Sequence, residues 1–266
     1  MSDRLAHAKI NLALVVGPGR PDGKHEVTTV LQRIALADRI RLEQADALSV
    51  EGFEDDTLVR RALELFATEA GIEPFWRVDI AKEIPVAAGL GGGSSDAAAA
   101  LTLANATLDR PVANDRLHEL AAGLGADIPF FLADGPQLGE GDGTTLTPLE
   151  LSQAFTVLVL VPKDETKVST AEVYAAFDAW GGSAGYDGRR SRLLEALAAG
   201  DLAGLPPNDL ATPSHAEELR RLGAFRADLS GAGPAVYGLF PDTRSAEAAG
   251  AVIETLGRVW IGPPAW

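Results

Sequence analysis

The sequence has 266 residues, of which 46% are hydrophobic and 23% are charged, a composition that is ordinary for a soluble globular protein of one large domain or two smaller ones. Its formal net charge of −15 argues against nonspecific binding to nucleic acid or to anionic membranes, because affinity for phosphate polymers comes largely from Lys and Arg. The absence of cysteine excludes disulfides and thiolate metal sites. No run approaches the ~20 apolar residues of a membrane span, and residues 1–4 begin no secretory signal, so the expected location is the cytoplasm.

The first predicted element is a strand over residues 5–16, in which apolar and polar residues alternate. This alternation places Lys9 and Asn11 on the same face. A turn is predicted at residues 17–23. A meander of three strands at 26–36, 39–43 and 48–50 and a helix at 55–70 are predicted to follow.

Residues 85–96 read Pro-Val-Ala-Ala-Gly-Leu-Gly-Gly-Gly-Ser-Ser-Asp and precede a run of alanines. The pattern predicts a glycine-rich loop that leads into a helix over residues 96–107, where free backbone N–H groups and the helix dipole suit a phosphate chain. The segment is neither of the two best-known phosphate loops, because no Lys follows the glycines and Ser94 stands where the dinucleotide pattern has glycine. The alternative is a tight turn before a close-packed Ala-rich helix.

A second helix is predicted at residues 113–124, and the carboxylate of Asp127 follows it within an apolar run. Pro129 disfavours helical backbone at Ile128, so this helix is expected to end before that position. A desolvated carboxylate needs a cationic or hydrogen-bonding partner, or it takes up a proton. The alternative is that Asp127 caps a helix or forms a turn. A hairpin turn is predicted at residues 139–143.

From residue 155 the order of elements, with the extra helices left aside, is β-α-β-β-α-β, which is the ferredoxin-like order, so we predict domains at residues 1–150 and 151–266. Ser169 and Glu172 form a capping box, and Val168 with Val173 the matching staple, which predicts a helix that begins at Thr170. The other predicted elements are a strand at 155–161, a loop at 181–188, helices at 190–199 and 214–222, a strand at 225–229, a small-residue turn at 230–234, a strand at 235–240, a helix at 244–256 and a strand at 258–261.

Three separated segments, at residues 8–12, 85–95 and 229–233, resemble the three motifs of the GHMP small-molecule kinases. Within that superfamily the chain is most similar to the kinases of the non-mevalonate isoprenoid pathway that act on a cytidine diphosphate-linked methylerythritol. This narrower resemblance rests on seven segments in the expected order, namely Ala8–Leu12, Asp22–Glu26, Gly89–Ser95, Leu124–Pro129, Val168–Thr170, Asn208–Leu210 and the final glycine turn.

The resemblance implies an α+β, two-domain GHMP kinase fold, with an N-terminal domain like domain 2 of ribosomal protein S5 and a ferredoxin-like C-terminal domain. It implies ATP as phosphoryl donor, Mg²⁺ as its metal, and phosphorylation of the 2-hydroxyl of the acceptor. The partner is then a small molecule, with no nucleic acid and no membrane, and the protein is a monomer or a homodimer.

In the family, the residues that match Lys9 and Asp127 form the catalytic pair. A carboxylate that a lysine keeps ionised can accept the proton of the acceptor hydroxyl, and Lys9 can stabilise charge on the transferring phosphoryl group. The resemblance assigns ATP to Lys82, Pro85, Gly89, Leu90, Gly91, Gly92, Gly93, Ser94 and Ser95, with the Ser95 hydroxyl near Mg²⁺. It assigns the acceptor to Asn11, Lys24, His25, Asp127, Tyr174, Ser230 and Gly231, with His25 at the cytosine edge and Tyr174 stacked on the base.

Each of these residues also has a plain structural interpretation. Lys9 is an exposed strand lysine in that interpretation, Lys82 and His25 are ordinary loop residues, Tyr174 belongs to the core, and the turn at Ser230 is only a sharp turn. The chain also departs from the family at two positions, since Lys24 replaces a frequent Tyr and Ala232 a frequent hydroxyl residue.

Two other functions remain open from the sequence. One is another GHMP kinase, for homoserine, mevalonate or an unassigned alcohol, against which the pattern Asp22-Gly23-x-His25 argues. The other is a nucleotide-binding regulator without catalysis, against which the presence of both Lys9 and Asp127 argues.

Overall fold

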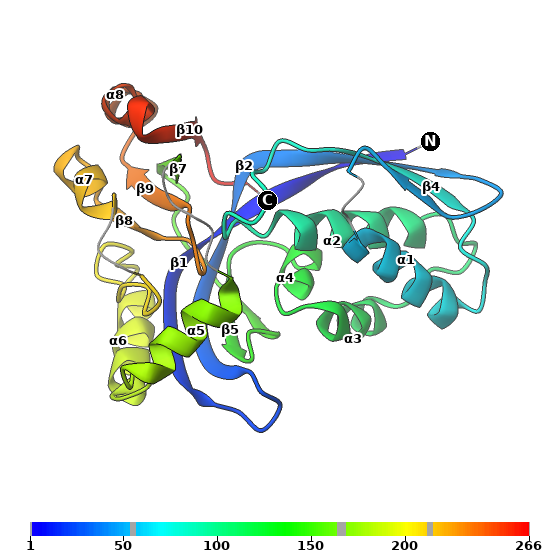
Figure 1. Cartoon of the computed structure of the whole chain (residues 1–266), viewed down its shortest axis with the longest axis horizontal. Helices are drawn as coiled ribbons and strands as arrows, with labels where there is room; N and C mark the ends of the chain where they lie inside the picture. Colours follow the sequence, from blue (N-terminus) through cyan, green and yellow to red (C-terminus); the bar gives the residue numbers. More distant parts are fainter. Residues whose placement is uncertain (1, 54–56, 164–168, 212–214, 266) are drawn as a thin grey trace. The chain divides into compact units, whose positions relative to one another are not determined.

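The computed structural model describes residues 2–53, 57–163, 169–211 and 215–265. The chain divides into two compact units that interleave along the sequence (Figure 1). The first unit comprises residues 1–8, 36–86 and 91–134, and the second comprises residues 9–35, 87–90 and 135–266. The strands β1 (Ser2–Gly19) and β2 (His25–Gln44) pair with each other and contribute residues to both units.

In the first unit, residues 39–44 of β2 pair antiparallel with β4 (Trp76–Ala81), which pairs parallel with β3 (Ser49–Glu51). The predicted meander is therefore wrong in two respects. The segments predicted at 26–36 and 39–43 form one continuous strand, because Ala37 and Asp38 do not turn the chain. In addition, β3 pairs with β4 rather than with the strand that precedes it.

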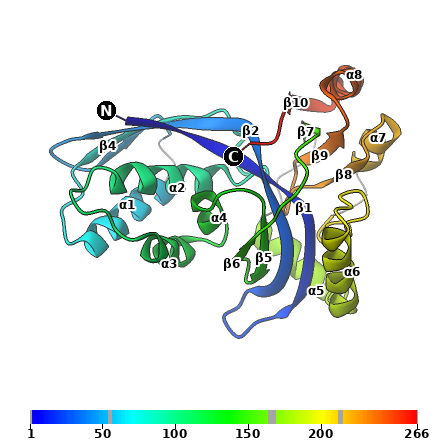
Figure 2. The same ribbon diagram turned by 180° about the vertical axis from the view of Figure 1, so that it is seen from behind.

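The helices of the first unit lie on one face of β2 and β4 (Figures 1 and 2). The helix α2 is almost entirely buried, which its alanines allow because small side chains let α1 and α4 pack closely against it. The helices are α1 (Thr57–Ala70), α2 (Gly92–Asn105), α3 (Asn114–Leu124) and α4 (Ile128–Leu132).

Two helix boundaries in this unit differ from the prediction. The helix α2 begins at Gly92 rather than at Asp96, because Gly91 takes the left-handed conformation (φ 71°) and serves as N-cap. A short helix that was not predicted, α4, begins at Ile128 with Pro129 in its first turn. Proline is tolerated there because the first N–H groups of a helix have no intrahelical partner.

The second unit contains the ferredoxin-like arrangement. Its four-stranded antiparallel sheet has the order β10-β7-β9-β8, so the predicted element order and the α+β class are confirmed. The apolar run predicted as a central strand is β7, which pairs on both sides. The strands are β7 (Thr156–Pro162), β8 (Arg226–Leu229), β9 (Val236–Phe240) and β10 (Gly257–Gly262).

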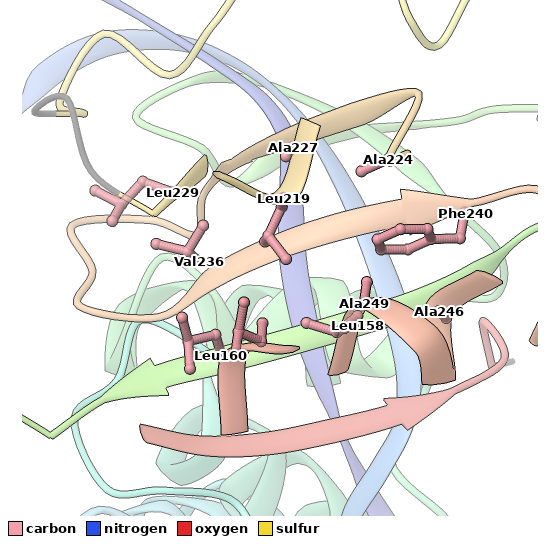
Figure 3. Close-up of a cluster of buried hydrophobic side chains, with 11 residues drawn as sticks. Leu158, Leu160, Leu219, Ala224, Ala227, Leu229, Val236, Phe240, Ala246 and Ala249 are labelled. Carbon is pink, nitrogen blue, oxygen red and sulfur yellow. The ribbon is translucent and has the colours of Figure 1, made fainter. Parts of the chain in front are cut away.

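One face of this sheet is covered by α7 (Ala216–Arg221) and α8 (Thr243–Ile253), which precedes a 3₁₀ turn at Glu254–Leu256. Figure 3 shows the cluster of apolar side chains between them, in which Leu158 of β7, Phe240 of β9 and Ala249 of α8 are buried. Burial of such apolar surface stabilises this half of the second unit.

Two further helices of the second unit follow β7. The helix α5 (Thr170–Ala179) begins with the predicted capping box, since the Ser169 hydroxyl accepts from the N–H of Glu172 and the Glu172 carboxylate accepts from the N–H of Ser169. Val168 of the predicted staple lies outside the described residues. The helix α6 (Tyr186–Ala198) begins inside the predicted loop, because Gly185 (φ 72°) is its N-cap.

A hairpin of β5 (Gln137–Gly141) and β6 (Thr145–Pro148) completes the second unit, with β5 paired to residues 27–31 of β2. Its turn lies at residues 142–144, later than predicted, where the Asp142 carboxylate accepts from the N–H and hydroxyl of Thr144. All strands of the four-stranded sheet follow residue 150 in the sequence. The domain boundary expected at that residue stays a prediction. Among the described helices, none is both long enough and apolar enough to cross a bilayer.

Candidate active site

A buried lysine lies in the second unit, on β1. The side chain of Lys9 is almost fully enclosed, with 4% of the residue exposed, and its ammonium donates to Oδ1 of Asn11 at 2.7 Å. The amide of Asn11 donates in turn to the hydroxyl of Thr29 at 2.8 Å, and that hydroxyl donates to the carbonyl oxygen of Ala13. The predicted pair on one face of the strand is thus a hydrogen-bonded chain. A charge is costly to bury without partners, so the hydrogen bond to Asn11 helps to stabilise the buried ammonium.

Two glycine segments meet beside Lys9 within the second unit. The backbone N–H of Lys9 donates to the carbonyl oxygen of Leu90 at 2.9 Å, and the Ser230 hydroxyl donates to that of Gly89 at 2.9 Å. A Cβ on Gly89 (φ +82°) would lie 2.2 Å from the carbonyl oxygen of Ser230, so no other residue fits there. A Cβ on Gly231 would lie 3.3 Å from Nζ of Lys9. The structure therefore brings together Lys9, Asn11, Gly89, Leu90, Ser230 and Gly231.

Asn208 holds this turn in place, although the sequence analysis assigned it no role in the site. Its side-chain amide donates to the carbonyl oxygens of Leu229 (3.0 Å) and Gly231 (2.7 Å), and its backbone N–H donates to the Asp228 carboxylate. Asn208 is buried, with 3% exposed. The signal that marked it was its place in the segment Asn208-Asp209-Leu210, one of the seven on which the resemblance rests.

In the first unit, Gly91 to Ser95 form the start of α2. The backbone N–H groups of a helix's first turn have no intrahelical acceptor, and here the first two helical residues are glycines, so no side chain shields the amides. Ser94 is partly exposed and Ser95 is buried, with 2% exposed. This geometry supplies the donors that a phosphate chain needs.

Lys82 lies just before this loop and forms two ion pairs within the first unit. Its ammonium donates to Oδ2 of Asp38 (2.5 Å) and to Oδ2 of Asp96 (2.7 Å), and both carboxylates are fully buried. The other oxygen of Asp38 accepts from the backbone N–H groups of Glu83 and Ile84. Asp38 thus fixes the segment that leads to Pro85, and Asp96 links it to the first turns of α2.

This cluster places two carboxyl groups against one ammonium. Burial, and after it repulsion from Asp38, raise the pKa of Asp96 to about 8, although Lys82 opposes the shift. Burial alone would lower the pKa of Lys82, but the two carboxylates outweigh it and raise the value. Oδ1 of Asp96 is buried without a hydrogen-bond partner among the described residues. Lys82 is accordingly a neutralised lysine that organises the loop, which neither interpretation of the sequence predicted.

A third group lies at the start of β2 in the second unit. Nε2 of His25 is 2.8 Å from Oδ1 of Asp178 on α5, and the His25 ring lies 4.8 Å from the ring of Tyr174, centroid to centroid. The ammonium of Lys24 donates to Oδ2 of Asp142 at 2.5 Å. Partial burial tends to raise the pKa of the Asp142 carboxyl, but the hydrogen bonds from Lys24 and Thr144 outweigh it and lower that pKa to about 2.

Asp127 lies in the first unit, where it is the N-cap of α4 and is partly exposed. The residue is thus less buried than the apolar run around it suggested. The helix α4 packs against α2 within this unit.

The described residues contain no cluster of three or more His, Asp or Glu side chains that could hold a metal ion. Mg²⁺ needs no such cluster when it binds together with a nucleotide, since it keeps several waters and takes one or two protein oxygens besides the phosphates. The Ser95 hydroxyl and the unpartnered Oδ1 of Asp96 are hard oxygen donors of the kind that this ion takes.

Two family models match separate regions of the chain. A family model of the GHMP kinases N terminal domain matches residues 57–135, and a model of the GHMP kinases C terminal region matches residues 216–258. A protein of Desulfitobacterium hafniense, named 4-diphosphocytidyl-2-C-methyl-D-erythritol kinase, is 37% identical over 97% of this chain and 94% of its own. A protein of the same name from Nocardia farcinica is 39% identical over 94% of this chain and 88% of its own.

Solved structures agree with these relatives. The crystal structure of a 4-(cytidine 5'-diphospho)-2C-methyl-D-erythritol kinase superimposes with a TM-score of 0.82 at 34% identity, over 100% of both chains. A homoserine kinase from Cytophaga hutchinsonii reaches a TM-score of 0.72 at 15% identity, over 96% of this chain and 94% of its own, which is a likeness of fold alone. Both parts of the fold and nearly the whole length are therefore shared, and the chain belongs to the GHMP kinase family and, within it, to the group of 4-diphosphocytidyl-2-C-methyl-D-erythritol kinases.

Proposed function

We propose that this enzyme transfers the γ-phosphoryl group of ATP to the 2-hydroxyl of 4-diphosphocytidyl-2-C-methyl-D-erythritol. The observation that carries the proposal is the ammonium of Lys9, which is enclosed at the junction of two glycine segments and held by Asn11. A buried ammonium beside backbone that leaves no room for side chains is suited to an anionic ligand. The relatives named above support the choice of acceptor.

In the proposed mechanism Asp127 accepts the proton of the acceptor hydroxyl as its oxygen attacks the γ-phosphorus, and the bond between that phosphorus and the bridging oxygen of ADP breaks. Lys9 stabilises the charge on the transferring group, which is the main task of a protein in phosphoryl transfer. Asn11 fixes the direction of the ammonium through the 2.7 Å hydrogen bond. The pairing of Lys9 with Asp127 is part of this proposal.

ATP is proposed to lie along the segment from Gly89 to Ser95, with its phosphates on the backbone N–H groups at the start of α2. Asp38 and Lys82 support this role by fixing the preceding segment, including Pro85, rather than by contacting phosphate. Mg²⁺ would be held by the nucleotide and the Ser95 hydroxyl, where it would neutralise charge on the phosphate oxygens.

The acceptor is proposed to lie on the second unit, with cytosine at His25 and Tyr174 and the polyol at Asn11, Ser230 and Gly231. The Lys24 ammonium donates to Asp142 and has further N–H donors for the diphosphate of the acceptor. The location in the cytoplasm, the lack of nucleic-acid and membrane partners and the monomeric or homodimeric state stay predictions of the sequence.

The test is an ATP-consumption assay against a panel of alcohols, comprising the cytidyl substrate, its uridyl analogue, homoserine and mevalonate. Turnover of the cytidyl substrate is expected to exceed that of the others. Preference for homoserine or mevalonate would identify another GHMP kinase, and ATP binding without turnover of any alcohol would identify a regulator.

The same assay on Lys9→Met tests the role of the ammonium, because methionine keeps the length of the side chain and removes its charge. We expect kcat to fall at least about 10²-fold, as when one stabilising donor is removed from a transition state. The control is Lys163→Met at an exposed lysine, which should keep the wild-type rate. A Lys9→Met enzyme that also kept it would exclude Lys9 from the chemical step.

A further inference from the structure

The contact between His25 and Asp178 has no part in the mechanism above. The His25 side chain is largely enclosed (11% exposed), whereas that of Asp178 is 56% exposed, and Nε2 lies 2.8 Å from Oδ1. Tyr174 and Asp178 are four residues apart on α5 and therefore share one face of this helix. That face presents an aromatic ring and a carboxylate to the same imidazole.

The position of Asp178 is fixed by the packing of α5. The helix is anchored at its start by the capping box of Ser169 and along its length by Phe177, which is 2% exposed and packs in a cluster with Leu14 and Val16 of β1. A carboxylate on such a helix is held in place without being buried itself. It can therefore set the orientation of the imidazole at little cost in desolvation.

This contact determines which nitrogen of His25 carries hydrogen. An ionised carboxylate can only accept a hydrogen bond, so Nε2 must donate. In the neutral imidazole the other nitrogen, Nδ1, is then left with a lone pair and acts as an acceptor. Asp178 thus chooses between the two tautomers of His25.

The two pyrimidines differ in what they present to such an acceptor. At position 4 cytosine carries an amino group, which donates hydrogen bonds, whereas uracil carries a carbonyl oxygen, which only accepts. An acceptor at Nδ1 pairs with the amino group and meets a second lone pair on uracil. A site built to bond one polar group rejects the analogue that lacks it, because its own polar atom is then left unpaired.

We infer that Asp178 is a specificity-determining residue, which acts through His25 by holding the Nε2–H tautomer and so selects a cytidyl over a uridyl acceptor. The inference rests on the proposed function, since it requires that the base lie at His25. It assigns to Asp178 a positioning role with no contact to the base.

The test compares Asp178→Asn with the wild-type enzyme. The amide of asparagine can donate to Nε2, which permits the tautomer with hydrogen on Nδ1 and converts the acceptor into a donor. We expect the ratio of kcat/KM for the cytidyl substrate over its uridyl analogue to fall about tenfold or more, mainly through KM, with the KM for ATP unchanged. Asp178→Glu, which keeps the carboxylate, should retain more of the ratio than Asp178→Asn. The control is Asp187→Asn, at an exposed aspartate on α6.

Nitrogen-15 NMR of the four histidines, with His25 assigned from a His25→Gln variant, gives a readout that does not depend on turnover. The wild-type spectrum is expected to show hydrogen on Nε2 of His25, and the Asp178→Asn spectrum to show a shift toward Nδ1. If the wild-type enzyme prefers the cytidyl substrate and Asp178→Asn keeps that preference within twofold, the inference is wrong and the proposed function stands. If the wild-type enzyme turns over no cytidyl substrate, the proposed function is wrong and the inference falls with it.

Discussion

The side-chain amide of Asn208 donates to the carbonyl oxygen of Gly231 at 2.7 Å, which ties a buried residue of one loop to the turn that faces Lys9. The same amide also bonds the carbonyl oxygen of Leu229 at 3.0 Å. One side chain thus fixes the backbone at two positions, the end of β8 and the turn that follows it. The geometry around the buried ammonium therefore depends on a residue that does not touch it.

Asn208→Ala should impair both stability and catalysis. The substitution removes the side-chain donor to the buried carbonyl oxygen of Leu229 and to the partly buried one of Gly231. A buried polar group left unsatisfied costs about 1–3 kcal/mol, so we expect a loss of about 2 kcal/mol in the free energy of unfolding, measured by urea denaturation. The kcat for the acceptor should fall as the turn at Gly231 loosens, while the KM for ATP stays near the wild-type value.

The control for this prediction is Asn105→Ala in the first unit, whose side chain likewise bonds backbone, at both the N–H and the carbonyl of Val112. It should lose stability and keep its kcat. Equal losses of kcat in the two variants would mean that Asn208 acts only through stability.

Asp127→Asn should reduce kcat by orders of magnitude and leave ATP binding nearly intact. The amide is isosteric but cannot accept the proton of the acceptor hydroxyl. Asp127 is the N-cap of α4, a position where asparagine is as favourable as aspartate, so the substitution should not disturb α4. Single-turnover kinetics with calorimetric titration of ATP separates the two effects, and a near-normal rate would remove Asp127 from the role of base.

Asp96 should make the stability of the fold depend on pH. Its pKa is raised to about 8 by burial and by Asp38, so between about pH 4 and pH 8 the folded state holds a proton that the unfolded chain releases. Stability from this group is therefore greatest at low pH and is lost as the pH rises through 8. The slope from one such proton is at most about 1.4 kcal/mol per pH unit.

Asp96→Asn removes this titration and keeps an oxygen toward Lys82. The free energy of unfolding of the variant minus that of the wild-type protein, measured by urea denaturation from pH 5 to pH 9, should increase with pH and level off above pH 8. Ionisable groups outside the cluster of Asp38, Lys82 and Asp96 titrate equally in both proteins and cancel in the difference. A difference that does not change with pH would show that Asp96 holds no extra proton.

Ala87→Gly should stabilise the protein. Ala87 has a positive φ of 58° without being glycine, and the left-handed conformation costs an L-residue about 1 kcal/mol. Thermal unfolding should show a higher Tm, with a gain of about 1 kcal/mol or slightly less. Ala106→Gly is the matched control, because Ala106 has an ordinary φ of −71°. That variant should gain nothing, and equal Tm values for both would mean that position 87 is unstrained.

The parts of the fold that the sequence predicted well are those with a local physical cause. The capping box of Ser169 and Glu172 lies within four consecutive residues, so their identity alone determines where α5 begins. The apolar run of β7 likewise predicts a strand that is covered on both sides. The glycine-rich loop before α2 was likewise predicted from local sequence, while its assignment to a ligand stays a prediction.

The parts that were missed depend on distant partners. Ala37-Asp38 suggested a break in β2, and the reason that the strand continues lies at Lys82 and Ile84, which are far along the chain and bond the Asp38 carboxylate. Asp178 gave no signal, because its partner His25 is 153 residues away. The helix α4 was not among the predicted elements, although Asp127 as a helix cap was one alternative for that position and Pro129 is compatible with a first turn.

The two ion pairs of Lys82 bear on the design of inhibitors for the proposed nucleotide site. An acidic group aimed at this lysine, as in many phosphate mimics, would meet the carboxyl groups of Asp38 and Asp96 already paired with it and would bring a further negative charge into a buried cluster. Uncharged carbonyl or sulfonyl acceptors directed at the amides of Gly92 and Gly93 avoid this repulsion. The better lead compounds against this enzyme should therefore be neutral, which also favours their passage into cells.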